Sequence, residues 1–149
     1  MVRIRRTSVL LLPLALSTAA LVAAAPAASA APVKQPVTIV VNTTFDPEVT
    51  DGFTGNVPGC GSGVVEDAAG RGPKFTPWGG VFSGTKSFTC DEGGGFDVRL
   101  QAVFGEAGSV GHWVVTDAWG SLEGLKGSGR LVGVPTEAGI EDTFVGTLR

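Results

Sequence analysis

Apolar and polar residues alternate along much of the chain with a period of two, the period of a β-strand with one dry face. In residues 96–104, every second residue is apolar, and Asp97, Arg99 and Gln101 fall between them. This pattern predicts a strand with Leu100 on the buried face and Arg99 on the solvated face. Further strands are predicted over residues 37–45, 62–67, 81–90, 112–117, 125–134 and 140–148.

Glycines separate the predicted strands and also lie within them. Three consecutive glycines form part of a hairpin turn predicted at residues 91–95. In residues 125–134, three glycines share a face with Leu125 and Leu131. Glycines on an apolar face weaken a flat strand but permit the strong coiling of a closing barrel. About seven or eight short strands therefore predict a single all-β domain, an antiparallel barrel of about eight strands, in preference to the alternative β-sandwich.

The first thirty residues predict a cleaved secretory signal peptide. Three arginines form a positive start, an alanine-rich apolar stretch follows over residues 9–25, and residues 28–30 have the small-x-small pattern of a cleavage site. A membrane anchor is the alternative, but a proline and two hydroxyl residues interrupt the apolar stretch. We expect cleavage after Ala30, a short spacer over residues 31–35, a barrel over residues 36–149, and a secreted, extracellular product.

Charge and composition exclude several functions. Without the signal peptide, Lys+Arg falls from 11 to 8 against 14 Asp+Glu, which gives a net charge of −6. A chain of that sign repels phosphate backbones and anionic membranes, so we expect no nucleic acid as a partner and no membrane after cleavage. Two cysteines and one histidine cannot supply a four-thiolate or a three-histidine zinc site. We predict no metal and no cofactor.

The two cysteines, Cys60 and Cys90, are predicted to form a disulfide, because an exported chain with two cysteines most simply pairs them. The closed loop would span about 31 residues, for which the chain-entropy model gives roughly 3.5–4 kcal/mol of stabilisation. The alternative is a reactive thiol, but no histidine lies near either cysteine in sequence to lower its pKa.

Two patterns that suggest a metal site or a catalytic triad are incomplete. The acidic segment 46–52 resembles a calcium loop, but Pro47 interrupts it and Val57 stands at the twelfth position, where a bidentate glutamate belongs. Any Ser-His-Asp triad would need His112, and Asp117 is the nearest acid in sequence. In an extended strand these two positions point to opposite faces. A solvated turn and a structural histidine are therefore favoured.

Asp142 interrupts the alternation of the last predicted strand, because it shares a face with Ile140, Phe144 and Leu148. If that face is buried, the pKa of the carboxyl should rise, which would make Asp142 a candidate catalytic acid or base inside the barrel. The favoured alternative is a one-residue bulge that returns the side chain to water.

The three tryptophans provide candidate ligand contacts. Tryptophans more often belong to the core, but in a secreted barrel they can also line the mouth or clamp an apolar ligand. Val115 shares the parity of Trp113 and would line the same cavity. The candidate ligand-binding residues are Trp78, Trp113, Val115 and Trp119.

Residues 111–113 have the sequence Gly-His-Trp, and residues 119–131 continue as Trp-Gly-Ser-Leu-Glu-Gly-Leu-Lys-Gly-Ser-Gly-Arg-Leu. This order of glycines and aromatics resembles barrels similar to allene oxide cyclase and plant dirigent proteins, and the hairpin at residues 82–104 resembles secreted bacterial members of that group. Trp-Gly-Ser departs from the Gly-Thr-Gly of these families, and Leu122 stands where an aromatic is usual. The resemblance implies a barrel fold. No catalytic residue of either family has a matching position here.

These patterns predict a secreted barrel that holds a small apolar ligand or the surface of an extracellular protein, without catalysis. One alternative is an enzyme similar to the cyclases and dirigent proteins, whose lumen would steer ring closure or coupling of an apolar substrate. A second is an extracellular inhibitor or adhesion module that acts through a long Pro/Gly loop at residues 70–80. A continuous open cavity would favour the first two classes, and a sealed core would favour surface interaction.

Overall fold

A computed structural model describes residues 33–149, of which residues 69–72 are described by their backbone alone. The predicted signal peptide and its cleavage site therefore lie outside the described residues. Over the described range, no helix has the length and hydropathy that are needed to cross a lipid bilayer.

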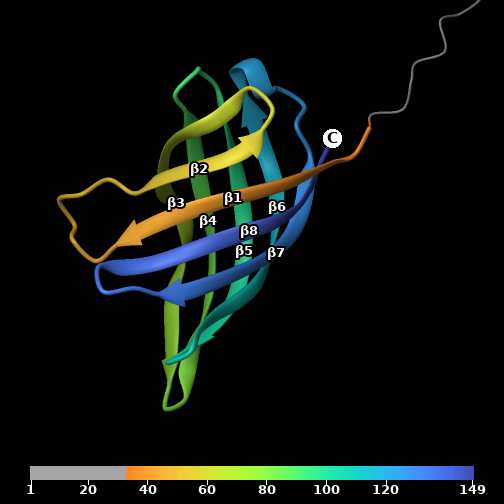
Figure 1. Cartoon of the computed structure of the whole chain (residues 1–149). Helices are drawn as coiled ribbons and strands as arrows, with labels where there is room; N and C mark the ends of the chain where they lie inside the picture. Colours follow the sequence, from red (N-terminus) through yellow and green to blue (C-terminus); the bar gives the residue numbers. More distant parts are fainter. Residues whose placement is uncertain (1–32) are drawn as a thin grey trace, which may run out of the picture. The chain divides into compact units, whose positions relative to one another are not determined.

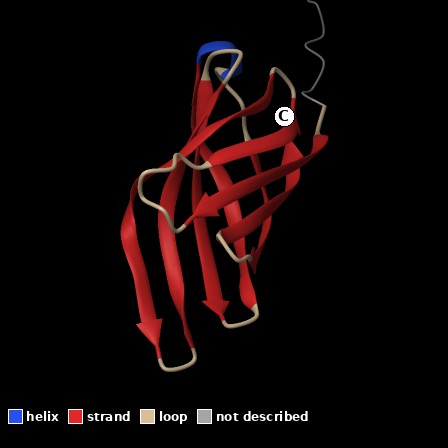
Figure 2. Ribbon diagram, turned by 60° about the vertical axis from the view of Figure 1, so that its left-hand side comes forward, coloured by secondary structure: helices blue, strands red, loops and turns tan. Residues whose placement is uncertain are grey.

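Eight antiparallel strands form a closed barrel (Figure 1). Each strand pairs with the next along the chain, and the last pairs with the first. The strands are β1 Gln35–Thr44, β2 Gly52–Val57, β3 Cys60–Thr76, β4 Gly79–Cys90, β5 Gly95–Gly105, β6 Gly108–Trp119, β7 Gly127–Pro135 and β8 Gly139–Leu148. Among the described residues, the only helical element is the 3₁₀ turn η1, Gly120–Leu122 (Figure 2). The predicted eight-stranded barrel is confirmed, and the sandwich alternative is wrong.

The alternating pattern places the side chains of β5 as the sequence predicts. Leu100 is buried and Arg99 is exposed, and β5 pairs with β4 and β6 along its whole length. By contrast, β2 was not predicted. Its six residues include two glycines and only two apolar side chains, Phe53 and Val57, too few to show a period. This segment is a strand because its backbone pairs with β1 and β3, which its own sequence does not indicate.

The long loop predicted at residues 70–80 is wrong, because this segment is the outer part of the β3–β4 hairpin. The pairing of the two strands continues to Thr76 and Gly79, and the hairpin projects beyond the rest of the barrel (Figure 1). Its register shifts between Arg71 and Lys74, so Pro73, which has no backbone N–H to donate, falls outside the ladder. The bulge thus explains how a segment rich in proline and glycine can still form part of a strand.

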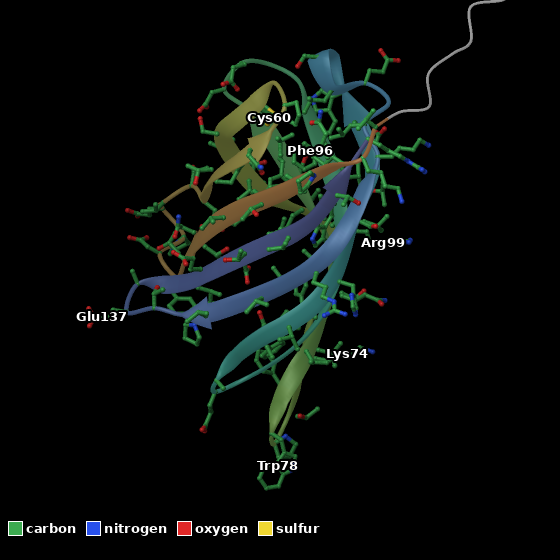
Figure 3. All side chains as sticks on the ribbon, turned by 45° about the vertical axis from the view of Figure 1, so that its right-hand side comes forward. Cys60, Lys74, Trp78, Phe96, Arg99 and Glu137 are labelled. Atoms are coloured by element: carbon green, nitrogen blue, oxygen red, sulfur yellow. A yellow bond between two sulfur atoms is a disulfide. The ribbon has the colours of Figure 1, made fainter. Side chains whose placement is uncertain are left out.

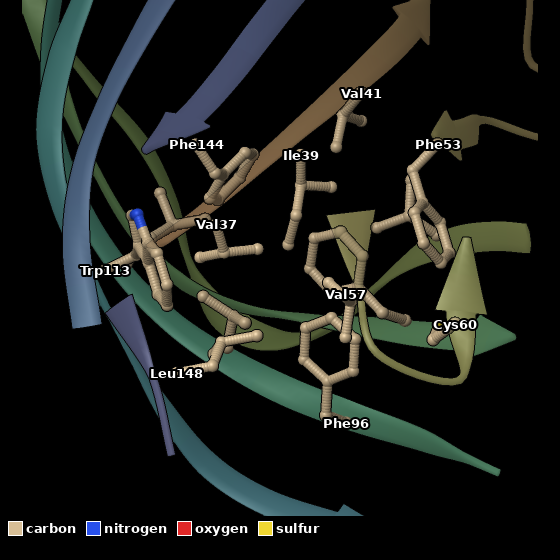
Figure 4. Close-up of a cluster of buried hydrophobic side chains, with 14 of the residues drawn as sticks. Val37, Ile39, Val41, Phe53, Val57, Cys60, Phe96, Trp113, Phe144 and Leu148 are labelled. Carbon is tan, nitrogen blue, oxygen red and sulfur yellow. The ribbon is translucent and has the colours of Figure 1, made fainter. Parts of the chain in front are cut away.

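Aromatic side chains fill the part of the barrel next to the disulfide (Figure 4). The ring of Phe88 stacks on Phe96 with centroids 4.8 Å apart. Phe53 and Phe144 meet the same ring edge-on, at 5.1 and 5.8 Å. All four rings are buried, so this end of the lumen is packed core.

The predicted disulfide between Cys60 and Cys90 is confirmed. It joins the start of β3 to the end of β4, with 5.2 Å between the two Cα atoms. Both residues belong to the buried core. A buried disulfide is consistent with an extracellular location.

Glycines on the inner face of the barrel make room for Trp113. A Cβ atom at Gly129 of β7 or at Gly146 of β8 would overlap the indole ring and the neighbouring backbone. The indole is 3% exposed, and its Nε1–H donates a hydrogen bond to the carbonyl oxygen of Arg130 at 3.0 Å. The apolar-face glycines of β7 therefore permit a large aromatic side chain inside a narrow barrel.

Candidate functional site

Beyond the aromatic core, the lumen opens into a cavity of about 390 Å³, which is within the size range of small-molecule sites. The cavity lies where β1, β3 and β5 end and β8 begins. Its walls are mainly apolar, with contributions from Phe82, Leu100, Phe104, Leu131 and Ile140. The barrel is thus packed at one end and hollow at the other.

Lys86 places a cation in this apolar wall. Its position on the inner face of β4 leaves it only 7% exposed, and its Nζ lies 2.9 Å from Oδ1 of Asp67. A buried ammonium without a partner is costly, so the Asp67 carboxylate is needed to hold Lys86 there. Asp67 is itself largely exposed, so it connects the cavity with solvent.

Asp142 also faces the cavity. It pairs with Val41 of β1 and Gly133 of β7, and neither ladder shifts register along β8. The expected bulge at Asp142 is therefore wrong: apolar residues on the same face of β8 fix the register and bring the carboxyl inside with them.

The pKa of Asp142 is raised above its ordinary value of 3.8, mainly because burial disfavours the charged carboxylate. The positive charge of Lys86 and a hydrogen bond from the Ser109 hydroxyl act in the opposite direction. The negative charges of Asp67 and Asp51 raise the pKa further. Asp142 is therefore easier to protonate than an ordinary surface carboxyl.

Two further polar groups line the same cavity. Ser109 stands beside Asp142, and a Cβ atom at Gly133 would overlap both Ser109 Oγ and Asp142 Oδ1. The Oγ1 atom of Thr43 is buried and has no hydrogen-bond partner among the described residues. The cavity therefore presents an apolar wall and a compact set of polar groups, the usual composition of a specific small-molecule site.

The four residues predicted to bind ligand do not meet at this cavity. Trp113 belongs to the core, and Val115 lines a separate groove between β6 and β7. Trp78 is 92% exposed at the tip of the β3–β4 hairpin (Figure 3), and Trp119 is half-exposed at the end of β6. None of them lines the 390 Å³ cavity, and their role in ligand binding stays a prediction.

Sequence reasoning identified Asp142 but missed Lys86, Ser109 and Thr43. The parity of Lys86 was visible, because it shares the inward face of the predicted strand 81–90 with Phe82 and Phe88. A lysine in phase with buried phenylalanines is a usable signal for a polar group in a lumen. Thr43 carries a similar signal, because it shares the apolar face of the predicted strand 37–45 with Ile39 and Val41. Ser109 carries none, because it lies outside the predicted strand 112–117.

A register shift in β6 changes the expected relationship between His112 and Asp117. Their partners on β5 are Gln101 and Asp97, which are four residues apart and share a face. The expectation that the two side chains point to opposite faces is therefore wrong. Four residues of strand nevertheless separate the pair by about 13 Å, which is too far for a triad. Both side chains are exposed.

In the acidic segment 46–52, two carboxylates accept hydrogen bonds from nearby backbone N–H groups. Asp46 accepts a hydrogen bond from the N–H of Glu48 at 3.0 Å, and Asp51 accepts one from the N–H of Thr44 at 2.8 Å. Across residues 33–149, no three His, Cys, Asp or Glu side chains are grouped so that they could hold a metal ion. The segment is a capped turn in this structure.

Comparison of the chain with protein-family models, curated proteins and solved structures finds no match. The similarity to allene oxide cyclase and dirigent barrels stays a prediction that rests on the glycine and aromatic pattern. The function must therefore be argued from the cavity itself.

Proposed function

We propose that this protein is an exported β-barrel module that holds a small, largely apolar ligand in the cavity at one end of its lumen. The observation that supports this proposal is an apolar cavity of ligand size with buried polar groups, in a barrel whose other end is filled by aromatic side chains. A structural core alone would not need a hollow end or a lysine within it.

The division of the wall into apolar and polar parts suggests how the ligand is held. Phe82, Leu100 and Leu131 provide apolar surface, which favours transfer of an apolar body from water. The polar groups around Asp142 would fix the orientation of one end of the ligand. Binding is non-catalytic in this proposal, because orientation and desolvation require no reacting group.

The test is to fill the cavity without disturbing the outer surface. Ala102 lines the cavity, whereas its neighbour Val103 is 54% exposed on the outside of β5. We expect Ala102→Phe to abolish binding of the neutral apolar dye N-phenyl-1-naphthylamine, and Val103→Phe to leave it unchanged. Circular dichroism and melting would show that both variants fold. Equal dye binding by wild type and a folded Ala102→Phe variant would contradict the proposal.

Mass spectrometry of small molecules that co-purify with the exported protein would complement the dye experiment. We expect an apolar molecule from wild type and Val103→Phe, and none from Ala102→Phe. The same molecule recovered equally from all three proteins would place its binding elsewhere.

A second candidate function is acid–base catalysis in the same cavity, as the resemblance to cyclases suggests. The raised pKa of Asp142, next to a buried ammonium in an apolar wall, favours this candidate. Incubation of the recovered molecule with wild type and with Asp142→Asn would separate holding from catalysis. A change in chemical structure that depends on Asp142 would support an enzyme, and unchanged recovery from both would support a binding module.

A further inference from the structure

The charges inside the cavity are unequal. Asp142 is influenced by one cation, Lys86, and by two other carboxylates, Asp67 and Asp51. The Lys86 ammonium already forms an ion pair with Asp67 at 2.9 Å. Asp142 has a hydrogen bond from the neutral Ser109 hydroxyl, and among the described side chains no cation forms an ion pair with it. The cavity therefore has more carboxylates than cations, and the hydrogen-bond acceptors of Asp142 are only partly used by donors of the protein.

Three of the four turns at the cavity end carry negative charge. Antiparallel pairing places the β1–β2, β3–β4, β5–β6 and β7–β8 connections at the cavity end of the barrel. These four connections contain no lysine or arginine, and Glu137 projects from the last of them (Figure 3). Their carboxylates are Asp46, Glu48, Asp51, Glu106 and Glu137.

The Lys74 cation, which lies on the β3–β4 hairpin, does not offset these carboxylates inside the cavity. Lys74 pairs with Val81, which is exposed on the outer face of the hairpin. The Lys74 side chain points away from the barrel (Figure 3). An acidic rim around an apolar cavity concentrates cations at the entrance and repels anions. Inside, a carboxylate ligand would have to compete with Asp67 for Lys86 and would lie near Asp142.

From this arrangement we infer that the ligand is an amphipathic cation, with an apolar body and a protonated amine that lies against Asp142. The inference rests on the proposed function, because it names the ligand class of the same cavity. An ammonium has three donors and no acceptor, which matches the unmet acceptors of the site. The Asp142 carboxylate accepts one N–H, and Thr43 Oγ1 on the inner face of β1, which has no partner among the described side chains, offers a second acceptor.

The experiment compares three probes that share an eight-carbon chain: octylamine, 1-octanol and octanoate. Each displaces N-phenyl-1-naphthylamine from the protein at neutral pH, where the amine is cationic and octanoate is anionic. We expect octylamine to bind about tenfold to a hundredfold more tightly than 1-octanol, as one charge-assisted hydrogen bond provides. Octanoate should bind more weakly than 1-octanol.

Asp142→Asn removes the carboxylate while keeping the size of the side chain, and it should abolish most of the preference for the amine over the alcohol. Glu123→Gln is the matched control, because it removes the same charge from an exposed position directly after η1, within the β6–β7 connection at the other end of the barrel. It should keep the preference of wild type.

The outcomes separate the two proposals. If the alcohol displaces the dye but the amine binds no more tightly, or if octanoate binds best, the ligand class is wrong and the binding function remains. If Asp142→Asn keeps the full amine preference, Asp142 is not the anchor and the inference is overturned. If the dye does not bind wild type and no probe shows direct binding by calorimetry, the proposed function fails, and the inferred ligand class fails with it.

Discussion

Gly133 of β7 is the cross-strand partner of Asp142 in β8. Because Gly133 has no side chain, Asp142 Oδ1 and Ser109 Oγ can occupy the space beside it. A Cβ atom at this position would overlap both oxygens. The backbone of Gly133 is not left-handed, so its role is to provide space rather than conformational freedom. Gly133 therefore allows the Asp142 carboxyl to lie close against the β7 backbone in the cavity wall.

We expect Gly133→Ala to displace Asp142 and Ser109 and to destabilise the protein by about 1–3 kcal/mol, as overpacking does. Urea denaturation would measure the change. Gly61→Ala is the control, because a Cβ atom there meets only ordinary contacts at 4.0 Å. Equal stability of Gly133→Ala and wild type would show that the cavity wall yields freely.

The raised pKa of Asp142 predicts a pH dependence of stability with a definite sign. Because the pKa is higher in the folded protein than the ordinary value of 3.8, the folded state binds this proton more tightly than the unfolded chain. The stabilisation is fully present below about pH 3.8 and is lost as the pH rises through the raised value. Asp142→Asn cannot ionise and lacks this component.

Urea denaturation of wild type and Asp142→Asn across a series of pH values tests this sign. The free energy of unfolding of wild type, relative to the variant, should fall as the pH is raised from about 3.8 towards neutral. Taking the difference between the two proteins removes the contribution of the other carboxylates. A difference that stays constant or rises with pH would contradict the raised pKa.

The alternating pattern predicted seven of the eight strands, because period two assigns each residue to a face whatever its neighbours are, and the glycines on the apolar face favoured a barrel. Leu100 and Arg99 illustrate this, and so do the inward glycines of β7 that admit Trp113. The disulfide between Cys60 and Cys90 followed from an even cysteine count in a chain that is predicted to be exported.

The bulges could not be predicted, because a bulge depends on the register of the neighbouring strand. A bulge was expected at Asp142, where both ladders are regular, and none was expected in β6, where the register shifts. The cavity at one end of the lumen could not be predicted from the sequence either. Parity places Lys86 and Phe88 on one inner face but does not indicate which of them faces packed core and which faces a cavity.

Net charge also proved a coarse guide to partners. A value of −6 for residues 31–149 describes the molecule as a whole. The turns at the cavity end contain acidic residues but no lysine or arginine, whereas the groove between β6 and β7 is lined by Lys34, Lys126 and Arg149 together with Asp117. The distribution of charge between the two ends depends on antiparallel topology, which brings alternate turns together.

The β5 register makes a direct test of the core possible. Leu100 is 2% exposed on the inner face, whereas Arg99 points to solvent. We expect Leu100→Ala to lower the free energy of unfolding by about 2–5 kcal/mol, because it removes buried surface and leaves a cavity. Arg99→Ala should change it by no more than about 0.5 kcal/mol. Chemical denaturation of both variants would measure the two values, and equal losses would contradict the register.

The disulfide should contribute strongly to stability, because it joins two cysteines with a sequence separation of 30 in a small domain. Replacement of Cys60 and Cys90 by alanine should lower the free energy of unfolding by roughly 3.5–4 kcal/mol, the loop-closure value for that length. Thermal melting of the double variant, beside wild type with and without reductant, provides the measurement. A double variant that melts with wild type would show that β3–β4 pairing alone holds the hairpin base.

Trp113 provides the sharpest test of where the core ends and the cavity begins. Its indole is buried, meets the Phe144 ring at 6.3 Å between centroids, and does not line the cavity. We therefore expect Trp113→Ala to destabilise the protein by about 3–5 kcal/mol. Trp113→Phe keeps an aromatic ring and loses the hydrogen bond to the Arg130 carbonyl, worth about 1 kcal/mol. It should fold and bind the apolar dye as wild type does. A Trp113→Phe variant that folds normally but loses dye binding would place the ligand against the indole, and the boundary between core and cavity would then lie deeper in the barrel.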